Sequence, residues 1–502
     1  MNFRNVLASL LSMSTISLVS CSGPKTSTPP PGGGGTATLS LTLRAAPLTP
    51  PASTNLLSFV VDINTISLTP SSGSAVNIPL SATTFSVDLT KGQSDSVFLG
   101  TSATVPPGTY NSITVSLANP VVTFCTQTAS NTGCASGSVT KISGAASAPQ
   151  VTTTPFPLTV TANQKTGLAI NFNLVNALTV NASQVVTAVN LAATNVLGAS
   201  TLPPAASSIA TGQLDFVEDV TGVVTAINTT TPSVTVQTAT RGSLTALANS
   251  STIFSPNCTN FNRNLAFSSC VLKGDVASLD TVLNSDGTLT LVEYDPLETT
   301  TGDWIEGIIT STPSSPAQFQ VVANNLVLST TSSLIGNALP LGSPVNITIP
   351  TSPQPQPFAV DTKGLVVPSA DPFTGRTDTS ALAPGQTVAA LITAFTAASG
   401  STLATASTNF LFLRFTRVTG SVASVAPPNT FTIQSLPTFF GLTTPVTVQL
   451  STGSPSTNFD GVTSSSNLTV GQTVSINALY FGPPLGPTST PTPFSAAKVR
   501  VP

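Results

Sequence analysis

The alternation of apolar and polar residues is the feature that most limits the fold of this chain. From residue 38 onward, apolar side chains recur at every second position, as in Leu39, Leu41 and Leu43. Successive side chains of a β-strand point to opposite faces, so a period of two predicts strands with one buried face. Turn sequences such as Pro106-Pro107-Gly108-Thr109 separate these segments. The sequence therefore predicts an all-β protein that begins with a β-sandwich over residues 36–197.

The composition supports folded domains and excludes several classes of function. Of the 502 residues, 40% are hydrophobic and 7% are charged, whereas about 25% of an ordinary soluble protein is charged. The net charge of -3 gives no field that would attract a nucleic acid, so no nucleic-acid partner is expected. The chain contains no histidine, which removes the usual general base and the commonest metal ligand.

The N-terminus has the pattern of an export signal. Arg4 precedes an apolar run from Val6 to Val19, and the run ends at Ser20-Cys21. The sequence Leu18-Val19-Ser20-Cys21 resembles the lipobox of bacterial lipoproteins, in which the cysteine is acylated. The resemblance implies a signal peptide over 1–20 and a lipid on Cys21 that anchors the protein to a membrane of the cell envelope. It favours the outer membrane or cell surface over the inner membrane. A soluble secreted protein with a chance cysteine is the alternative.

Residues 21–35 are rich in Pro and Gly and predict a disordered tether. The four cysteines that remain fall into two close pairs, Cys125 with Cys134 and Cys258 with Cys270. In an oxidising compartment this spacing predicts two disulfides. A metal site is the rival interpretation, but without histidine or a third clustered cysteine we expect no metal and no cofactor.

A repeated pattern fills the second part of the chain. After a predicted linker at 198–212, Thr221-Gly222-Val223-Val224 returns as Thr419-Gly420-Ser421-Val422. A looser copy begins at Glu306-Gly307-Ile308-Ile309, and its extra length is expected in the Pro-rich stretch 350–377. The pattern predicts three small β-barrel modules, at 213–300, at 301–416 with an insertion, and at 417–502.

Two resemblances agree with this division. Val87-Asp88-Leu89-Thr90-Lys91-Gly92, followed by Val105-Pro106-Pro107-Gly108-Thr109-Tyr110, resembles a prealbumin-like β-sandwich domain of bacterial surface lipoproteins whose function is unknown. The three repeats resemble a family of small OB-like barrel modules in exported bacterial proteins, also of unknown function. Both resemblances imply fold and location, and neither brings catalytic residues.

Acidic residues cluster before two of the repeats. Asp215, Glu218 and Asp219 precede the first, and Asp303 and Glu306 precede the second. Paired carboxylates hydrolyse glycosides when one of them has a raised pKa, so a carboxylate-dependent glycoside hydrolase is one hypothesis. The other is that they are solvated acids at a module boundary, which their recurrence favours. We assign no catalytic residue and predict that the protein is not an enzyme.

Aromatic residues give one candidate ligand patch. Trp304 and Tyr294 flank the first module boundary and either form a small exposed patch, as in a polysaccharide-binding module, or pack between the barrels. The sequence as a whole predicts a lipid-anchored protein of the cell envelope with a non-catalytic binding or structural role. A polymer or protein of the envelope is its expected partner, recognised through Thr-rich strands and uncovered sheet edges.

Overall fold

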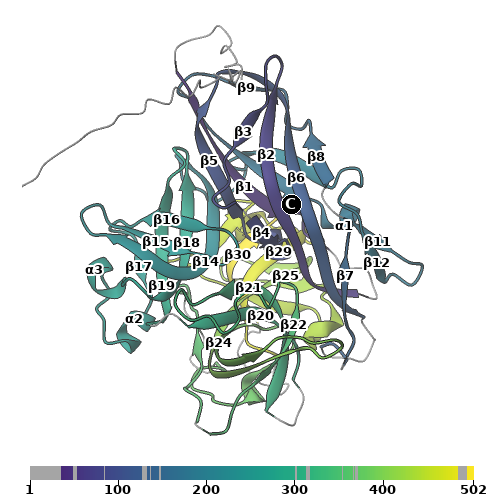
Figure 1. Ribbon diagram of the computed structural model, residues 1–502, viewed down its shortest axis with the longest axis vertical. Helices are drawn as coiled ribbons and strands as arrows, with labels where there is room; N and C mark the ends of the chain where they lie inside the picture. Colours follow the sequence, from purple (N-terminus) through teal and green to yellow (C-terminus); the bar gives the residue numbers. More distant parts are fainter. Residues whose placement is uncertain are drawn as a thin grey trace, which may run out of the picture.

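The computed structural model describes residues 35–48, 54–83, 85–126, 133–135, 137–145, 148–299, 302–312, 317–352, 354–365, 367, 371–483 and 494–502. The predicted signal peptide, Cys21 and the tether up to residue 34 lie outside these residues. The described part consists of strands with a few short helices, which confirms the all-β prediction. A sandwich and three barrels pack around one centre (Figure 1).

The sandwich has two facing sheets. The first has the order β13-β10-β1-β5, in which β1 and β10 are parallel. Its strands are β1 (Ala37–Ala45), β5 (Val97–Val105), β10 (Lys165–Phe172) and β13 (Leu197–Leu202). The second sheet is built on the long pair β2 and β6; its strands are β2 (Thr54–Pro70), β3 (Val76–Ile78), β4 (Phe85–Asp88), β6 (Gly108–Thr126), β7 (Val139–Ser143), β8 (Ala148–Thr152) and β9 (Leu158–Val160). Three short elements complete it: η1 (Lys91–Gln93), α1 (Leu174–Ala177) and the hairpin β11 (Leu178–Val180) with β12 (Val186–Val189).

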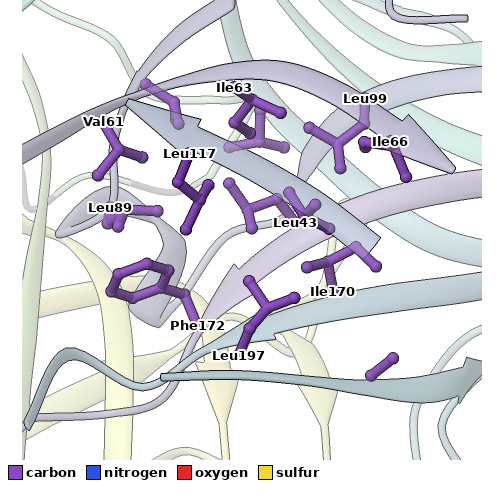
Figure 2. Packing of buried hydrophobic residues seen from close by; sticks show 14 of the residues in the cluster. Leu43, Val61, Ile63, Ile66, Leu89, Leu99, Leu117, Ile170, Phe172 and Leu197 are labelled. Carbon is purple, nitrogen blue, oxygen red and sulfur yellow. The ribbon is translucent and has the colours of Figure 1, made fainter. Parts of the chain in front are cut away.

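The alternating residues of the sequence form the core between these two sheets. Leu39, Leu41 and Leu43 of β1 are each at most 1% exposed, and they face β2 and β6 across the sandwich. Figure 2 shows Leu43 and Ile170 from one sheet packed against Ile63 and Leu117 from the other. The strand β13 continues from the last residue of the predicted sandwich, Leu197, into the first five residues of the predicted linker, 198–202, and it extends the first sheet beside β10.

Barrel 1 follows the sandwich. It comprises β14 (Gln213–Asn228), β15 (Ser233–Gln237), β16 (Ser243–Leu247), β17 (Ile253–Phe254), α2 (Asn257–Asn260), α3 (Phe267–Cys270), β18 (Val276–Asn284) and β19 (Leu289–Glu298). β14 pairs with both β15 and β18, β18 pairs with β19, and a parallel pairing of β16 with β19 closes the ring.

Barrels 2 and 3 share one long strand, β25 (Ala404–Ala426). Barrel 2 comprises β20 (Asp303–Ser311), β21 (Gln318–Val327), β22 (Pro344–Thr348), β23 (Ala359–Val360), η2 (Thr379–Ala381), β24 (Thr387–Thr396) and the first part of β25. Barrel 3 comprises the second part of β25, β26 (Thr430–Gln434), η3 (Thr438–Phe440), β27 (Val446–Leu450), β28 (Asn458–Asp460), η4 (Ser465–Asn467), β29 (Thr473–Tyr480) and β30 (Phe494–Arg500). β25 therefore runs through the predicted boundary between 416 and 417.

The pairing order of barrel 1 recurs in the other two barrels. β20 pairs with β21 and β24, and the second part of β25 pairs with β26 and β29. Parallel pairings of β22 with β25 and of β27 with β30 close these rings. The glycine that opens each sequence copy is explained by this pairing: a side chain at Gly222, Gly307 or Gly420 would collide with a backbone carbonyl of the facing strand.

Candidate functional site

The acidic residues that precede the repeats are buried, which corrects the expectation that they are solvated. Asp215 is fully buried, and Asp219 and Glu306 are each 4% exposed. They lie on β14 and β20, the first strands of barrels 1 and 2, and the sandwich and the neighbouring barrel cover them. A buried carboxylate is stable only when it is paired or hydrogen-bonded, so these acids require partners.

A bulge in β14 places adjacent acids in this interior. The register between β14 and β18 shifts between Val217 and Val220, and Asp219 in the bulge has a left-handed backbone with φ +54°. Asp tolerates this conformation better than most residues because its short side chain bonds locally. Its own amide donates to the carboxylate of Asp280 on β18, at 2.9 Å. The bulge therefore allows both Glu218 and Asp219 to be buried.

Arginines of β25 neutralise the buried acids where barrel 2 passes into barrel 3. Arg414 is 1% exposed; its guanidinium pairs with Asp361 and lies 3.5 Å from both Asp219 and Glu306. Arg417 pairs with Asp219 and, at 2.5 Å, with Asp95 of the sandwich. One strand thus supplies cations to acids from the sandwich and two barrels.

Two lysines extend these ion pairs to further acids of barrels 1 and 2. Lys363, from the loop after β23, lies 3.0 Å from Asp219 and 2.6 Å from Asp280. The ammonium of Lys91 in η1 donates to Glu306. These two lysines connect barrel 2 to barrel 1 and to the sandwich.

A second group of ion pairs joins the sandwich to barrels 1 and 3. Arg44 of β1 lies 2.6 Å from Asp215 and 3.2 Å from Asp460 at the end of β28. Arg500 of β30 is 2.8 Å from the same Asp460 carboxylate and donates to two backbone carbonyls of the sandwich, those of Gly92 and Asp95. The side chains of both groups form what we call the central charge cluster: Arg44, Lys91, Asp95, Asp215, Asp219, Asp280, Glu306, Asp361, Lys363, Arg414, Arg417, Asp460 and Arg500.

The carboxyl groups in and beside the cluster are of two electrostatic types. Burial alone would raise the pKa of Asp219, but Lys363, Arg417 and Arg414 hold that pKa well below its ordinary value. Burial would likewise raise the pKa of Glu306, and Lys91 with Arg414 lowers it. Beside the cluster, burial raises the pKa of Glu218 to about 7 although Lys498 and Lys363 oppose the shift. Asp219 and Glu306 are thus held ionised as structural ions.

A pocket lies beside the cluster, between the barrels. Its volume is about 40 Å³, and it is partly open to solvent. Barrel 1 contributes Glu218, Asp280 and Glu293, and barrels 2 and 3 contribute Lys363 and Asn458. We call it the inter-barrel pocket.

The aromatic residues proposed as a ligand patch are buried. Trp304 is 1% exposed and packs against Phe410 and Phe412, with ring centroids 6.2 and 6.1 Å away. It shares a hydrophobic cluster with Val223 of barrel 1, so it lies between barrels. The hydroxyl of the fully buried Tyr294 lies 3.1 Å from the carboxylate of Asp275. Neither ring presents an exposed face to a ligand.

The predicted cysteine pairs are at disulfide distance. The Cα atoms are 5.8 Å apart in Cys125–Cys134 and 5.4 Å apart in Cys258–Cys270. Within the described residues, no group of three or more Cys, Asp and Glu side chains has a geometry that could hold a metal ion. The helices of that part of the chain are also all too short or too polar to span a membrane.

Sequence reasoning missed the basic members of the cluster, and also its acids Asp95, Asp280 and Asp361. Arg414 and Arg417 lie in the mainly apolar run Phe410 to Val418, and Arg500, with the neighbouring Lys498, interrupts the mainly apolar β30. In a chain with so few charges, a cation inside a strand pattern is a signal that a buried anion faces it. That signal could have identified the cations but not their partners.

Comparison with known proteins bears on the sandwich. No curated protein and no solved structure matches this chain. Residues 36–187, which make up most of the sandwich, match the family model described as "Domain of unknown function (DUF4382)".

Proposed function

We propose that this protein is a lipid-anchored component of the bacterial cell envelope whose sandwich and three OB-like barrels act as one rigid, non-catalytic scaffold. The central charge cluster carries the proposal. Interfaces between the domains of one chain usually allow relative motion unless they are large and well packed. Here Arg44 and Arg417 each contact acids of two other modules, and Arg414 contacts an acid of barrel 1 as well as two of its own barrel. Rotation of any module would leave a buried charge without its counter-ion.

The use of charge inside the protein also supports a neutral exterior. Most of the 18 acidic residues of the chain are buried. The outer faces of strands therefore present mainly Thr, Ser, Asn and Gln, which bind polymers or other chains by hydrogen bonds more than by electrostatic attraction. This surface suits a binding or structural role at the envelope.

The ion pairs favour the scaffold over a glycoside hydrolase. A hydrolase of the two-carboxylate type needs an acid and a second carboxylate on either side of a substrate cleft. Asp215 is held by Arg44, and the pKa of Asp219 is lowered by four cations, Lys363, Arg417, Arg414 and Lys91. Trp304 and Tyr294, the aromatic residues of the polysaccharide-binding alternative, are buried.

Replacement of Cys21 by Ser tests the anchor. The Cys21→Ser protein is expected to leave the membrane fraction and to lose incorporation of a labelled fatty acid, whereas Thr26→Ala in the tether leaves both unchanged. A single acyl chain binds marginally, and two or more bind stably, so loss of the site removes anchoring altogether. Membrane retention of Cys21→Ser after a carbonate wash would refute the lipid anchor.

A further inference from the structure

The inter-barrel pocket combines an apolar wall with an acidic end. Its volume of about 40 Å³ has room for roughly three water-sized groups, which suits the tip of a slender chain. The apolar wall consists of Phe216, Ile253, Val292, Leu365, Pro455 and Ala497. All three barrels contribute to the lining, so the pocket exists only when the barrels are assembled.

Carboxylate oxygens at the acidic end lack hydrogen-bond partners. Glu218 is 7% exposed and Glu293 is 3% exposed, and both line the pocket. Neither Oε2 of Glu218 nor Oε1 of Glu293 has a hydrogen-bond partner in the described part of the chain. The other oxygen of Glu218 accepts from the side-chain amide of Asn458 at 3.3 Å. A buried acceptor without a partner costs about 1–3 kcal/mol, so the pocket is incomplete without a donor.

The nearby cations do not satisfy these oxygens. Lys363 is engaged by Asp219 and Asp280. Lys498 is fully buried, and its ammonium, which has no hydrogen-bond partner in the described part of the chain either, lies 3.9 Å from Oε2 of Glu218, beyond hydrogen-bond distance. The pocket lining therefore brings together three carboxyl groups, those of Glu218, Asp280 and Glu293, and one ammonium, that of Lys363.

We propose that the inter-barrel pocket binds a primary alkylammonium group, such as the side chain of a lysine in a peptide, with the ammonium between Glu218 and Glu293 and the methylene stem along the apolar wall. An ammonium supplies three donors and one positive charge, which matches two unpartnered acceptors and a lining with more carboxyl groups than cations. A bare metal ion fits less well, because no metal-binding group of side chains occurs among the described residues.

Ionisation of the glutamates distinguishes this ligand from a neutral one. Burial raises the pKa of Glu218 to about 7 against Lys498 and Lys363, and Asp95 and Asp280 raise it further. Burial also raises the pKa of Glu293 well above its ordinary value, and the neighbouring carboxyls of Asp280, Asp361 and Asp295 add to this while Lys363 opposes it. An ammonium favours the charged glutamates, so its binding releases protons and tightens as the pH rises.

Calorimetry on the full-length protein in detergent tests the proposal with Nα-acetyl-lysine methylamide as the probe. We expect saturable binding that is at least tenfold tighter at pH 8 than at pH 6, with proton release seen as a heat that varies with the ionisation enthalpy of the buffer. The neutral analogue Nα-acetyl-norleucine methylamide should bind at least tenfold more weakly. Equal binding of both probes, pH-independent binding or no binding of the lysine probe would each refute the proposal.

Substitutions locate the site and separate it from the scaffold proposal. Glu293→Gln and Glu218→Gln are each expected to weaken binding of the lysine probe at least tenfold, whereas Asp286→Asn in the β18–β19 turn leaves it unchanged. Trp304 fluorescence checks that each variant is folded. Unaltered binding in a folded Glu293→Gln protein would overturn the assignment. Because Cys21→Ser leaves the pocket intact, it should bind the probe normally, so failure of the lipid anchor and failure of the pocket are distinguishable.

Discussion

Replacement of Arg414 by Met tests whether the central charge cluster holds the modules together. The guanidinium pairs with Asp361, lies 3.5 Å from Asp219 and Glu306, and donates to Ser278 at 2.8 Å. Methionine fills much of the same volume but supplies no charge and no donor. The substitution therefore removes a cation from three buried carboxylates but creates only a small cavity.

The expected loss follows from the burial of both partners. Arg414 and Asp361 are each 1% exposed, so the surviving carboxylate cannot gain hydration in place of its ion pair. Removal of one partner of a buried pair costs about 3–5 kcal/mol, although replacement of the whole pair by apolar residues is often neutral. We expect Arg414→Met to lower the free energy of unfolding by about 4 kcal/mol at pH 7. With a urea slope of about 2 kcal/mol/M, the midpoint falls by about 2 M.

Trp304 provides the assay, because it is the sole tryptophan and it packs against Phe410 and Phe412, close to Arg414 on β25. Urea unfolding followed by its fluorescence reports the region around the substitution. Arg376→Met, at an exposed arginine of barrel 2, is the matched control and should change stability by less than about 0.5 kcal/mol.

The pH dependence of the loss gives a second check. The folded pKa values of Asp219 and Glu306 are lowered, so their ion pairs stabilise the fold above the ordinary carboxyl pKa near 4 and cease to do so as the pH falls through the folded values. The difference between wild type and Arg414→Met should therefore be largest at pH 7 and shrink below about pH 4.5. A midpoint shift at pH 7 no larger than that of Arg376→Met would refute the role of the cluster.

Two further predictions concern the disulfide of barrel 1 and its buried Glu218. Cys258 and Cys270 are fully buried and 12 residues apart, so the double variant Cys258→Ser/Cys270→Ser should lose about 3 kcal/mol in urea unfolding without reductant; a midpoint equal to that of wild type would contradict this. The pKa of Glu218 is raised to about 7 in the folded protein, so the unfolded chain loses this proton at a lower pH than the folded one. Glu218 therefore does not affect the free energy of unfolding below about pH 4.5, lowers it progressively between pH 4.5 and 7, and lowers it by a constant amount above that range. Glu218→Gln should match wild type near pH 4.5 and exceed its stability at pH 8 by up to about 3 kcal/mol, and a less stable variant at pH 8 would show the reasoning to be wrong.

Local sequence patterns predicted much of the fold because strands and turns are local structures. The alternation at Leu39, Leu41 and Leu43 placed β1, and the spacing of Cys258 and Cys270 predicted their pairing. These features depend on neighbours a few residues away, which the sequence displays directly.

The charge cluster could not be predicted in this way, because its contacts join residues that are far apart in the chain. Arg44 and Asp460 meet across 416 positions, and their contact depends on how the sandwich packs against barrel 3. Asp460 precedes Gly461, and an Asp-Gly pair is the local signal of a turn with positive φ at the glycine. Gly461 does have φ +83°, but the side chain of Asp460 also binds Arg44 and Arg500. Asp460 therefore both begins a turn and joins two ion pairs, and only the turn has a local sequence signal.

The location of the charges explains how so sparsely charged a chain specifies one arrangement of a sandwich and three similar barrels. Apolar faces of β-barrels are alike, so hydrophobic burial alone distinguishes poorly between alternative packings of such modules. A misplaced module would leave Asp219 or Arg414 buried without a counter-ion, at a cost of about 3–5 kcal/mol each. The correct packing is the one that satisfies Arg44, Arg414 and Arg417 together. On this argument the cluster contributes more to selecting the assembly than to its total stability. Loss of a single partner should therefore lower the free energy of unfolding far more than loss of a whole pair.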